Sequence, residues 1–206
     1  MSDLRRDKGK ATRDRLVSTA RDLFAERGYE GTSIEAVLAA AGVKRGSLYH
    51  HFPGKEALFD AVLDGLLRDI ADSTEAAARA AGPDPAANLR AGCFCWLHLA
   101  LDAAIQRIVL VDAPSVVGWR RVRDLDEQHA LGRLRANLSR IATGGRLPED
   151  QVDIMAHMLL AALGEAALLI ARAEDQRAAL VSATAAVTTL IDRLVSPAPS
   201  VAAITP

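Results

Sequence analysis

The chain has few cysteines, few charge-free apolar stretches and a net charge near zero, and the first two scarcities each exclude a class of protein. Its 206 residues include only two cysteines, Cys93 and Cys95, too few for a disulfide framework. No apolar run of about eighteen residues, the length that a membrane-spanning helix needs, is free of charge. The first ten residues are polar and lack the apolar stretch of a signal peptide. We therefore expect a cytoplasmic protein that has no membrane partner and keeps its thiols reduced.

The net charge is −1, but it is unevenly distributed along the chain. Residues 1–55 hold 11 basic and 7 acidic side chains, a net charge of +4, and residues 56–206 hold 14 and 19, a net charge of −5. A basic first quarter on an acidic remainder suits a head that reads DNA and a body with another task. Ordinary scatter of charges would also produce such a difference.

Residues 32–55, TSIEAVLAAAGVKRGSLYHHFPGK, are the most informative stretch. Thr32 and Glu35 have the spacing of a capping box, in which each side chain bonds the other residue's free backbone N–H at a helix start. Apolar residues then recur at helical spacing as far as Gly42, where a left-handed residue would end the helix. The pattern predicts a short helix followed by a tight turn.

A second short helix is expected from about Lys44 to Phe52. Leu48 and Phe52 would form its inner face, because residues four apart share one side of a helix. Its outer face would carry basic, aromatic and imidazole side chains: Lys44, Arg45, Ser47, Tyr49, His50 and His51. Two short helices in this arrangement form a helix-turn-helix, whose second helix enters the major groove of DNA.

The run from Thr12 to Val62 resembles the DNA-binding domain of the TetR family of bacterial transcriptional regulators. The residues that carry the resemblance are Ala20, Leu23-Phe24, Gly28-Tyr29, Thr32-Ser33-Ile34, Ala41-Gly42-Val43, Gly46-Ser47-Leu48-Tyr49-x-His51-Phe52 and Lys55-Glu56-x-Leu58. Residues 107–119 match part of the family more loosely. The resemblance implies a homodimeric regulator, a repressor in most cases, that binds a near-palindromic operator in double-stranded DNA. It also implies release by a small hydrophobic effector and no cofactor.

The candidate DNA contacts follow from these positions. Arg45 begins the second helix, where an arginine can grip guanine O6 and N7; the alternative is a solvated surface arginine. Gly46 lets the backbone approach DNA, and Lys55, at the start of the next helix, is a candidate phosphate anchor. By resemblance, Tyr49 and His51 contact phosphates and His50 meets bases. The full set is Thr32, Ser33, Lys44, Arg45, Gly46, Ser47, Tyr49, His50, His51 and Lys55, with capping as the other role of the first two.

The rest of the chain is also helical in pattern, so we expect an all-α fold of about nine helices. The expected organisation is a three-helix DNA-binding domain over residues 1–54 and a helical effector-binding and dimerisation domain over residues 55–196. The tail, residues 197–206, is expected to be disordered.

Two features of the expected body point to further sites. Bulky apolar residues offer the walls of a pocket, with His98, His157 and Glu165 as polar anchors; the walls are Phe94, Trp96, His98, Leu101, Val116, Trp119, Met158 and Ala162. The last two helices have apolar stripes wide enough for burial on more than one side, and in the resembled family these helices pair with their twins. The expected dimer interface is Met155, Leu159, Leu163, Ala167, Val187, Leu190, Ile191 and Leu194.

No catalytic set or metal site is expected. Cys93, Cys95 and His98 are close in sequence, but helical positions advance ~100° per residue and point the cysteines apart, so they cannot converge on one tetrahedral ion. The sequence leaves open a DNA-binding regulator without a small-molecule effector and, less favoured, a helical enzyme.

Overall fold

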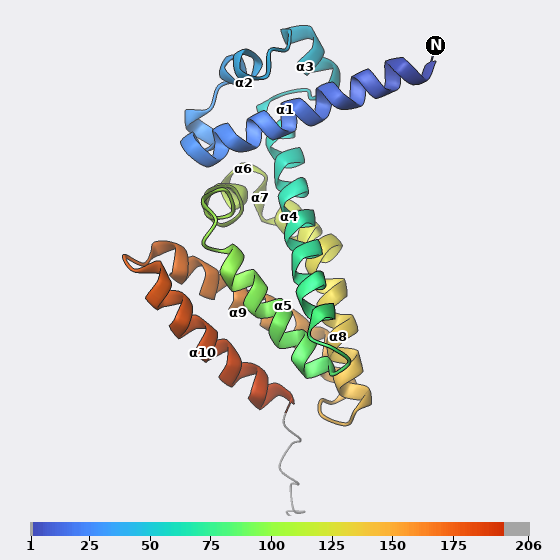
Figure 1. The fold of residues 1–206 in the computed structure, drawn as a ribbon, viewed down its shortest axis with the longest axis vertical. Helices are drawn as coiled ribbons and strands as arrows, with labels where there is room; N and C mark the ends of the chain where they lie inside the picture. Colours follow the sequence, from blue (N-terminus) through green and yellow to red (C-terminus); the bar gives the residue numbers. More distant parts are fainter. Residues whose placement is uncertain (1, 196–206) are drawn as a thin grey trace, which may run out of the picture. The chain divides into compact units, whose positions relative to one another are not determined.

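The computed structural model describes the backbone of residues 2–195 and the side chains of residues 8–195. Figure 1 shows helices joined by short connections, and the described residues contain no strand. The expected all-α class is confirmed. The tail predicted to be disordered, residues 197–206, lies outside the described residues.

The helices follow one another along the chain with few residues between them. They are α1 (Ser2–Gly31), α2 (Ile34–Ala41), α3 (Arg45–His51), α4 (Lys55–Ala80), α5 (Pro85–Leu99), the π-helical η1 (Ile105–Asp112), α6 (Ala113–Val116), α7 (Gly118–Asp126), the π-helical η2 (Glu127–Leu131), α8 (Gly132–Thr143), the 3-10 turn η3 (Glu149–Gln151), α9 (Val152–Arg172) and α10 (Gln176–Val195). The π turn η2 interrupts the helical run between α7 and α8.

The chain folds into two compact units, and neither is a single stretch of sequence. Among the described residues, the first unit contains residues 2–68 and 102–124, and the second contains residues 69–101 and 125–195. This division differs from the expected domains, because residues 102–124 cluster with α1–α3 and the first part of α4, and η1 packs against α1. The boundaries of the functional domains stay a prediction.

An aromatic cluster lies at the centre of the first unit. The Phe24 ring lies edge-on to the Phe59 ring, with centroids 5.2 Å apart, and Tyr29 meets both rings at 5.9 and 5.3 Å. Phe24 and Phe59 have no exposed surface. The α1 helix extends from Ser2 to Gly31, and its regular geometry breaks at Gly28, which has φ 71° and ψ 175°. Only glycine adopts this region readily, so α1 is kinked at Gly28.

The second unit is a helical bundle of α5, α8, α9 and α10. Asp84 caps α5 by accepting hydrogen bonds from the Ala86 and Ala87 N–H groups, and α5 and α10 lie side by side (Figure 1). The Arg90 guanidinium joins these two helices through the Asp192 carboxylate, at 2.6 Å. The buried apolar side chains of all four helices form one core, in which the largest fully buried residues are Leu97, Leu138, Ile141, Ile170 and Ile191.

Two segments are long and apolar enough to cross a membrane by length and composition. They are Glu149–Arg172, with a mean hydropathy of 2.0, and Gln176–Val195, with a mean hydropathy of 1.5. Only 28% and 17% of these windows are buried inside the chain. Core helices of soluble proteins can have the same length and composition. The low buried fractions show that much of the apolar surface of α9 and α10 is exposed in the single chain.

Candidate nucleic-acid interface

The helix-turn-helix begins with a cap that differs from the predicted one. Ser33, not Thr32, is the N-cap of α2, and its hydroxyl accepts a hydrogen bond from the Ala36 N–H at 3.1 Å. The Thr32 side chain is buried, and its hydroxyl lies 2.8 Å from the Gly28 carbonyl oxygen, to which it donates. The capping box was therefore a wrong prediction, because this hydroxyl closes the end of α1 instead. A DNA contact by Thr32 stays a prediction.

We expect Ser33→Ala to destabilise the protein by about 1 kcal/mol, the usual effect of removing an N-cap oxygen. Chemical denaturation followed by circular dichroism measures it. Ser33→Asp is the matched control, because it keeps an accepting oxygen and adds a negative charge where the helix dipole favours one. Equal stability of Ser33→Ala and the wild type would contradict the cap assignment.

The turn and the second helix fold as the sequence predicts. Gly42 is left-handed, with φ 63° and ψ 33°, and its N–H bonds the C-terminal carbonyls of α2. In α3, Leu48 is fully buried and Phe52, just beyond the helix, is 3% exposed. The opposite side faces outward and carries the exposed residues Lys44, Arg45, Gly46, Tyr49 and His50 together with the half-buried Ser47 and His51. This helix presents a continuous polar surface of the kind that DNA requires.

Arg45 is held in place by two neighbours on this surface. Its guanidinium forms an ion pair with the Glu35 carboxylate, and its central carbon lies 6.0 Å from the centre of the Tyr49 ring. Backbone hydrogen bonding and then Arg45 lower the pKa of Glu35, so the pair stays ionised at neutral pH. Exposed ion pairs contribute little free energy, and Arg45 can therefore exchange Glu35 for a base or a phosphate at small cost.

Lys55 does not reach outward as predicted for a phosphate anchor. Its ammonium donates a hydrogen bond to the Tyr29 carbonyl oxygen at 2.9 Å and lies 4.1 Å from the centre of the Tyr29 ring. Such a cation–π contact adds to the hydrogen bond. In this conformation Lys55 joins the start of α4 to the end of α1.

The structure adds basic residues beside α3 that the site prediction did not include. Lys8, Lys10 and Arg13 are exposed on the first turns of α1, and the Arg13 guanidinium lies 5.2 Å from the centre of the Phe52 ring. A Cβ added at Gly9 would lie 4.0 Å from the His51 ring, so α1 passes close to the end of α3. These basic residues thus lie on α1 next to the exposed surface of α3.

The residues predicted to line a ligand pocket are not brought together in either unit. Within the second unit, Phe94, Trp96 and Leu101 pack against the core, and the Trp96 ring N–H donates to the Leu163 carbonyl at 3.0 Å. His98 is exposed and bonds the Phe94 carbonyl, Ala162 is half-buried, and Met158 is 58% exposed. Val116 and Trp119 belong to the first unit, where Trp119 is 69% exposed.

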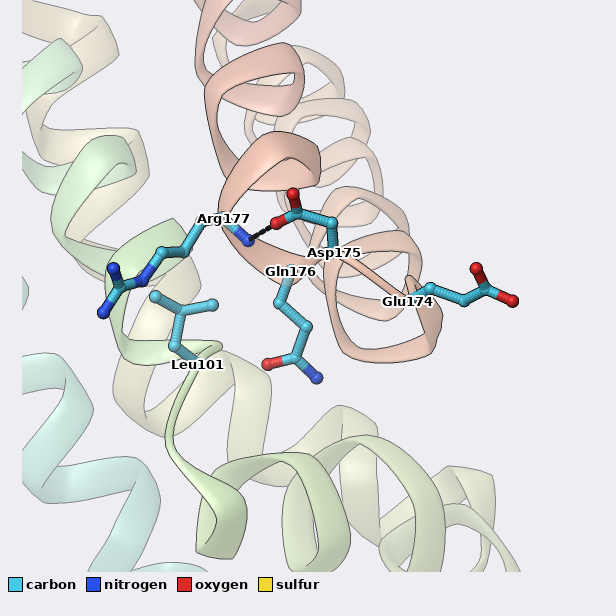
Figure 2. A pocket seen from close by; sticks show the side chains of 5 residues that line it. All are labelled: Leu101, Glu174, Asp175, Gln176 and Arg177. Carbon is cyan, nitrogen blue, oxygen red and sulfur yellow. Dashed lines mark hydrogen bonds between the residues drawn. The ribbon is translucent and has the colours of Figure 1, made fainter.

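One open pocket in the second unit has a different lining. Leu101 and residues 174–177 surround a hollow of about 530 Å³ at the start of α10. Figure 2 shows the Leu101 and Arg177 side chains near each other and Glu174 pointing away from them. The Arg177 N–H is occupied by the Asp175 carboxylate at 3.0 Å. The predicted set supplies only Leu101 to this charged, solvent-open surface.

The predicted dimer interface is largely the core of a single chain. Leu159, Leu163, Ala167, Val187 and Ile191 are all less than 5% exposed, and Met155 and Leu194 pack against the same core. Leu190, at 43% exposed, is the outward-facing member of the predicted set. Within one chain α5 and α8 cover this stripe, and its role in a dimer interface stays a prediction.

Further large apolar side chains of α9 and α10 are exposed, and we refer to them together as the outer face. Its large members are 43–71% exposed and comprise Ile154, Met158, Leu169, Val181 and Leu190. Small exposed residues continue it, among them Ala161, Ala178, Ala185 and Ala186. Glu165, predicted as a polar anchor of the pocket, is exposed between Ala161 and Leu169 on α9.

The two cysteines have no metal to hold in the described part of the chain. Residues 8–195 contain no group of three or more His, Cys, Asp or Glu side chains placed to bind an ion. Burial raises the pKa of Cys93 to about 12, so this side chain remains a neutral thiol within the core of the second unit.

Family models match both parts of the sequence. The model for bacterial regulatory proteins of the tetR family matches residues 16–62, and the model for the tetracyclin repressor-like C-terminal domain matches residues 86–194, more than half of the chain. The chain belongs to the TetR family. It is accordingly a DNA-binding transcriptional regulator, and the resemblance seen in residues 12–62 is confirmed.

Individual proteins show how far the similarity extends. The crystal structure of a TetR-family transcriptional regulator from Pectobacterium atrosepticum is 32% identical with a TM-score of 0.78, and the match covers 92% of this chain and 97% of that one. The repressor KstR2 from Rhodococcus jostii is 47% identical over 58 residues, which are 28% of each chain. FadR from Bacillus subtilis shares the fold, with 18% identity, a TM-score of 0.72 and coverage of 90% and 98%.

The first unit of this TetR-family chain also contains an acidic residue that the site prediction missed. The Asp112 carboxylate at the end of η1 accepts hydrogen bonds from the Tyr29 N–H at 2.8 Å and from Arg107 at 3.1 Å. The sequence signal was the looser match over residues 107–119, which includes both Arg107 and Asp112. Nothing in the local pattern indicated that the partner would be a backbone group 83 residues earlier.

Proposed function

We propose that the protein is a homodimeric repressor whose two α3 helices enter successive major grooves of a near-palindromic operator, in the cytoplasm where that DNA lies. The observation that carries the dimer is the outer face of α9 and α10. Large apolar side chains that remain 43–71% exposed on two neighbouring helices are typical of a protein–protein interface. A second copy covers this face with the same residues, as a twofold interface requires.

The proposed DNA contacts are the outward-facing residues of the helix-turn-helix. Arg45 reads a base, and its neighbours contact phosphates or the edges of bases; the set is Ser33, Lys44, Arg45, Gly46, Ser47, Tyr49, His50 and His51. Phosphate contacts supply most of the affinity and base contacts supply the specificity. No catalytic role is proposed.

We further propose release by a small hydrophobic ligand. FadR from Bacillus subtilis, which shares the fold, was solved in complex with stearoyl-CoA. A ligand releases this protein from DNA only if it binds the DNA-free conformation more tightly than the DNA-bound one.

A regulator without a small-molecule effector is the second candidate. It is favoured by the placement of the expected pocket residues, since Trp96 packs against the core and Met158 faces outward. Abundance or a protein partner would then control the protein.

Selection of genomic DNA fragments by the purified protein at ~150 mM salt tests the DNA-reading function, because non-specific binding weakens as salt rises. An inverted repeat with half-sites about one helical turn (~34–36 Å) apart is the expected result. Recovery of random fragments alone would overturn the proposal. With the repeat in hand, fluorescence anisotropy of a labelled operator then screens hydrophobic ligands for release.

Arg45→Ala is expected to weaken binding at one operator base pair by about 1–3 kcal/mol and to relax specificity there. Lys44→Ala is the matched comparison. As a phosphate contact, Lys44 should affect all sequences alike and reduce the slope of log affinity against log salt by about one. Binding to a full set of single-base operator variants separates the two roles, and equal patterns from the two substitutions would refute the assignment.

A further inference from the structure

Tyr29, the first residue after the Gly28 break in α1, is fixed on both sides of its backbone. Its N–H donates to the Asp112 carboxylate at 2.8 Å. Its carbonyl oxygen accepts from the Lys55 ammonium at 2.9 Å and from the Thr32 N–H at 3.3 Å. Because α2 starts at Ile34, the orientation of Tyr29 sets the direction in which the chain enters the helix-turn-helix.

The Asp112 carboxylate is buried, and its burial is explained by the hydrogen bonds that it accepts. The residue is only 7% exposed, and burying a carboxylate costs free energy unless it is paired and hydrogen-bonded. One oxygen, Oδ2, accepts both the Tyr29 N–H and the Arg107 Nε–H, the latter at 3.1 Å. Arg107 thus neutralises the charge and orients the oxygen that holds Tyr29.

The end of α1 is shaped to receive Arg107. A Cβ at Gly28 would lie 2.0 Å from a guanidinium nitrogen of Arg107, and this glycine has a φ of 71° that other residues rarely adopt. The missing side chain therefore lets Arg107 pass next to the backbone of α1. Gly28, Tyr29, Arg107 and Asp112 all belong to the first compact unit.

We propose that Arg107 and Asp112 are positioning residues for DNA reading, which fix Tyr29 and through it the orientation of α2 and α3. They lie outside the helix-turn-helix, and η1 would thus form part of the DNA-reading head although α4 and α5 separate it from α3 in sequence. The inference rests on the proposed DNA-reading function. It gives the segment around residues 107–112 a role in the specificity of DNA binding.

Asp112→Leu removes the accepting oxygen while keeping a side chain of similar shape. We expect about tenfold weaker binding to the operator recovered by selection and an affinity within about twofold of wild type for a scrambled duplex of equal length. Asp112→Asn keeps one accepting oxygen and should retain most of the operator affinity. Asp124→Asn, an exposed site in the same unit, controls for the lost negative charge.

The sign of the effect separates positioning from electrostatics. Removing an acidic charge from a DNA-binding unit strengthens its attraction to phosphates. The Asp124→Asn variant should therefore bind each duplex as tightly as the wild type does, or more tightly. Weaker operator binding by Asp112→Leu is therefore the opposite of the effect that the lost negative charge alone would have. Unchanged operator binding, or an equal loss on both duplexes, would overturn the proposal.

Arg107→Met provides an independent variant, because the Arg107 side chain is 45% exposed and its removal leaves the core intact. We expect about threefold weaker operator binding from it alone and no further loss when it is added to Asp112→Leu, as for residues that act through one contact. Additive losses would contradict a shared role.

The wild-type protein separates failure of this inference from failure of the proposed function. If the wild type binds all DNA sequences equally well, the proposed function fails. If the wild type is selective and the variants bind as it does, only this inference is refuted.

Discussion

Replacing Leu169 and Val181 with glutamate is expected to convert the proposed dimer to a monomer and to weaken operator binding by about a hundredfold or more, because a monomer loses the gain from holding two heads on one DNA. The two side chains are 61% and 71% exposed on the outer face. In a twofold dimer each substitution occurs twice, so four carboxylates would be buried without partners. Analytical ultracentrifugation measures the assembly, and fluorescence anisotropy measures operator affinity.

Leu163→Ala is the matched substitution on the opposite side of α9. Leu163 is 4% exposed within its own chain, so its truncation should lower stability by about 2–5 kcal/mol and leave the dimer assembled. The reverse outcome, a stable monomer from Leu163→Ala and an intact dimer from the double glutamate variant, would restore the interface that the sequence alone suggested.

Phe59→Ala is expected to destabilise the first unit by about 3–5 kcal/mol, the range for removing a fully buried phenylalanine. The ring has no exposed surface and contacts both Phe24 and Tyr29 edge-on. Its loss leaves a cavity beneath the residue that connects α1 to the helix-turn-helix. For a protein of this size the midpoint of thermal unfolding should fall by roughly 6–20 °C.

Differential scanning calorimetry checks this effect, and Phe59→Leu is the control. Leucine refills much of the volume, so its cost should be clearly smaller. Similar losses from the two variants would show that the aromatic contacts with Phe24 and Tyr29, rather than the filled volume, supply the stability.

The helix-turn-helix could be predicted because its signals are local. Gly42 adopts the left-handed conformation that its place in the pattern required, and Leu48 and Phe52 are buried four residues apart. The cap was misassigned by one position because Thr32 and Ser33 are both capping residue types. The end of the preceding helix decided between them, since the Thr32 hydroxyl donates a hydrogen bond to the Gly28 carbonyl oxygen four residues earlier.

In the second unit, the helical spacing of apolar residues does not predict which side of a helix is buried. The pattern of α9 contains two apolar stripes, one through Leu163 and one through Met158, and spacing alone does not say which of them other helices cover. The fold buries the first and exposes the second. Likewise, the contact between Asp112 and Tyr29 joins groups 83 residues apart, which no local rule can anticipate.

The two-part composition of the first unit has a consequence for biosynthesis. Translation proceeds at about 5–20 residues per second, so Asp112 is made roughly 4–17 seconds after Tyr29, the residue it holds. Until then the nascent α1–α4 region lacks η1, α6 and α7, the elements that complete its unit. By the same reasoning, a chimaera that exchanges heads between regulators should carry residues 102–124 together with the first 68, because a graft cut after α3 leaves the end of α1 without its acceptor.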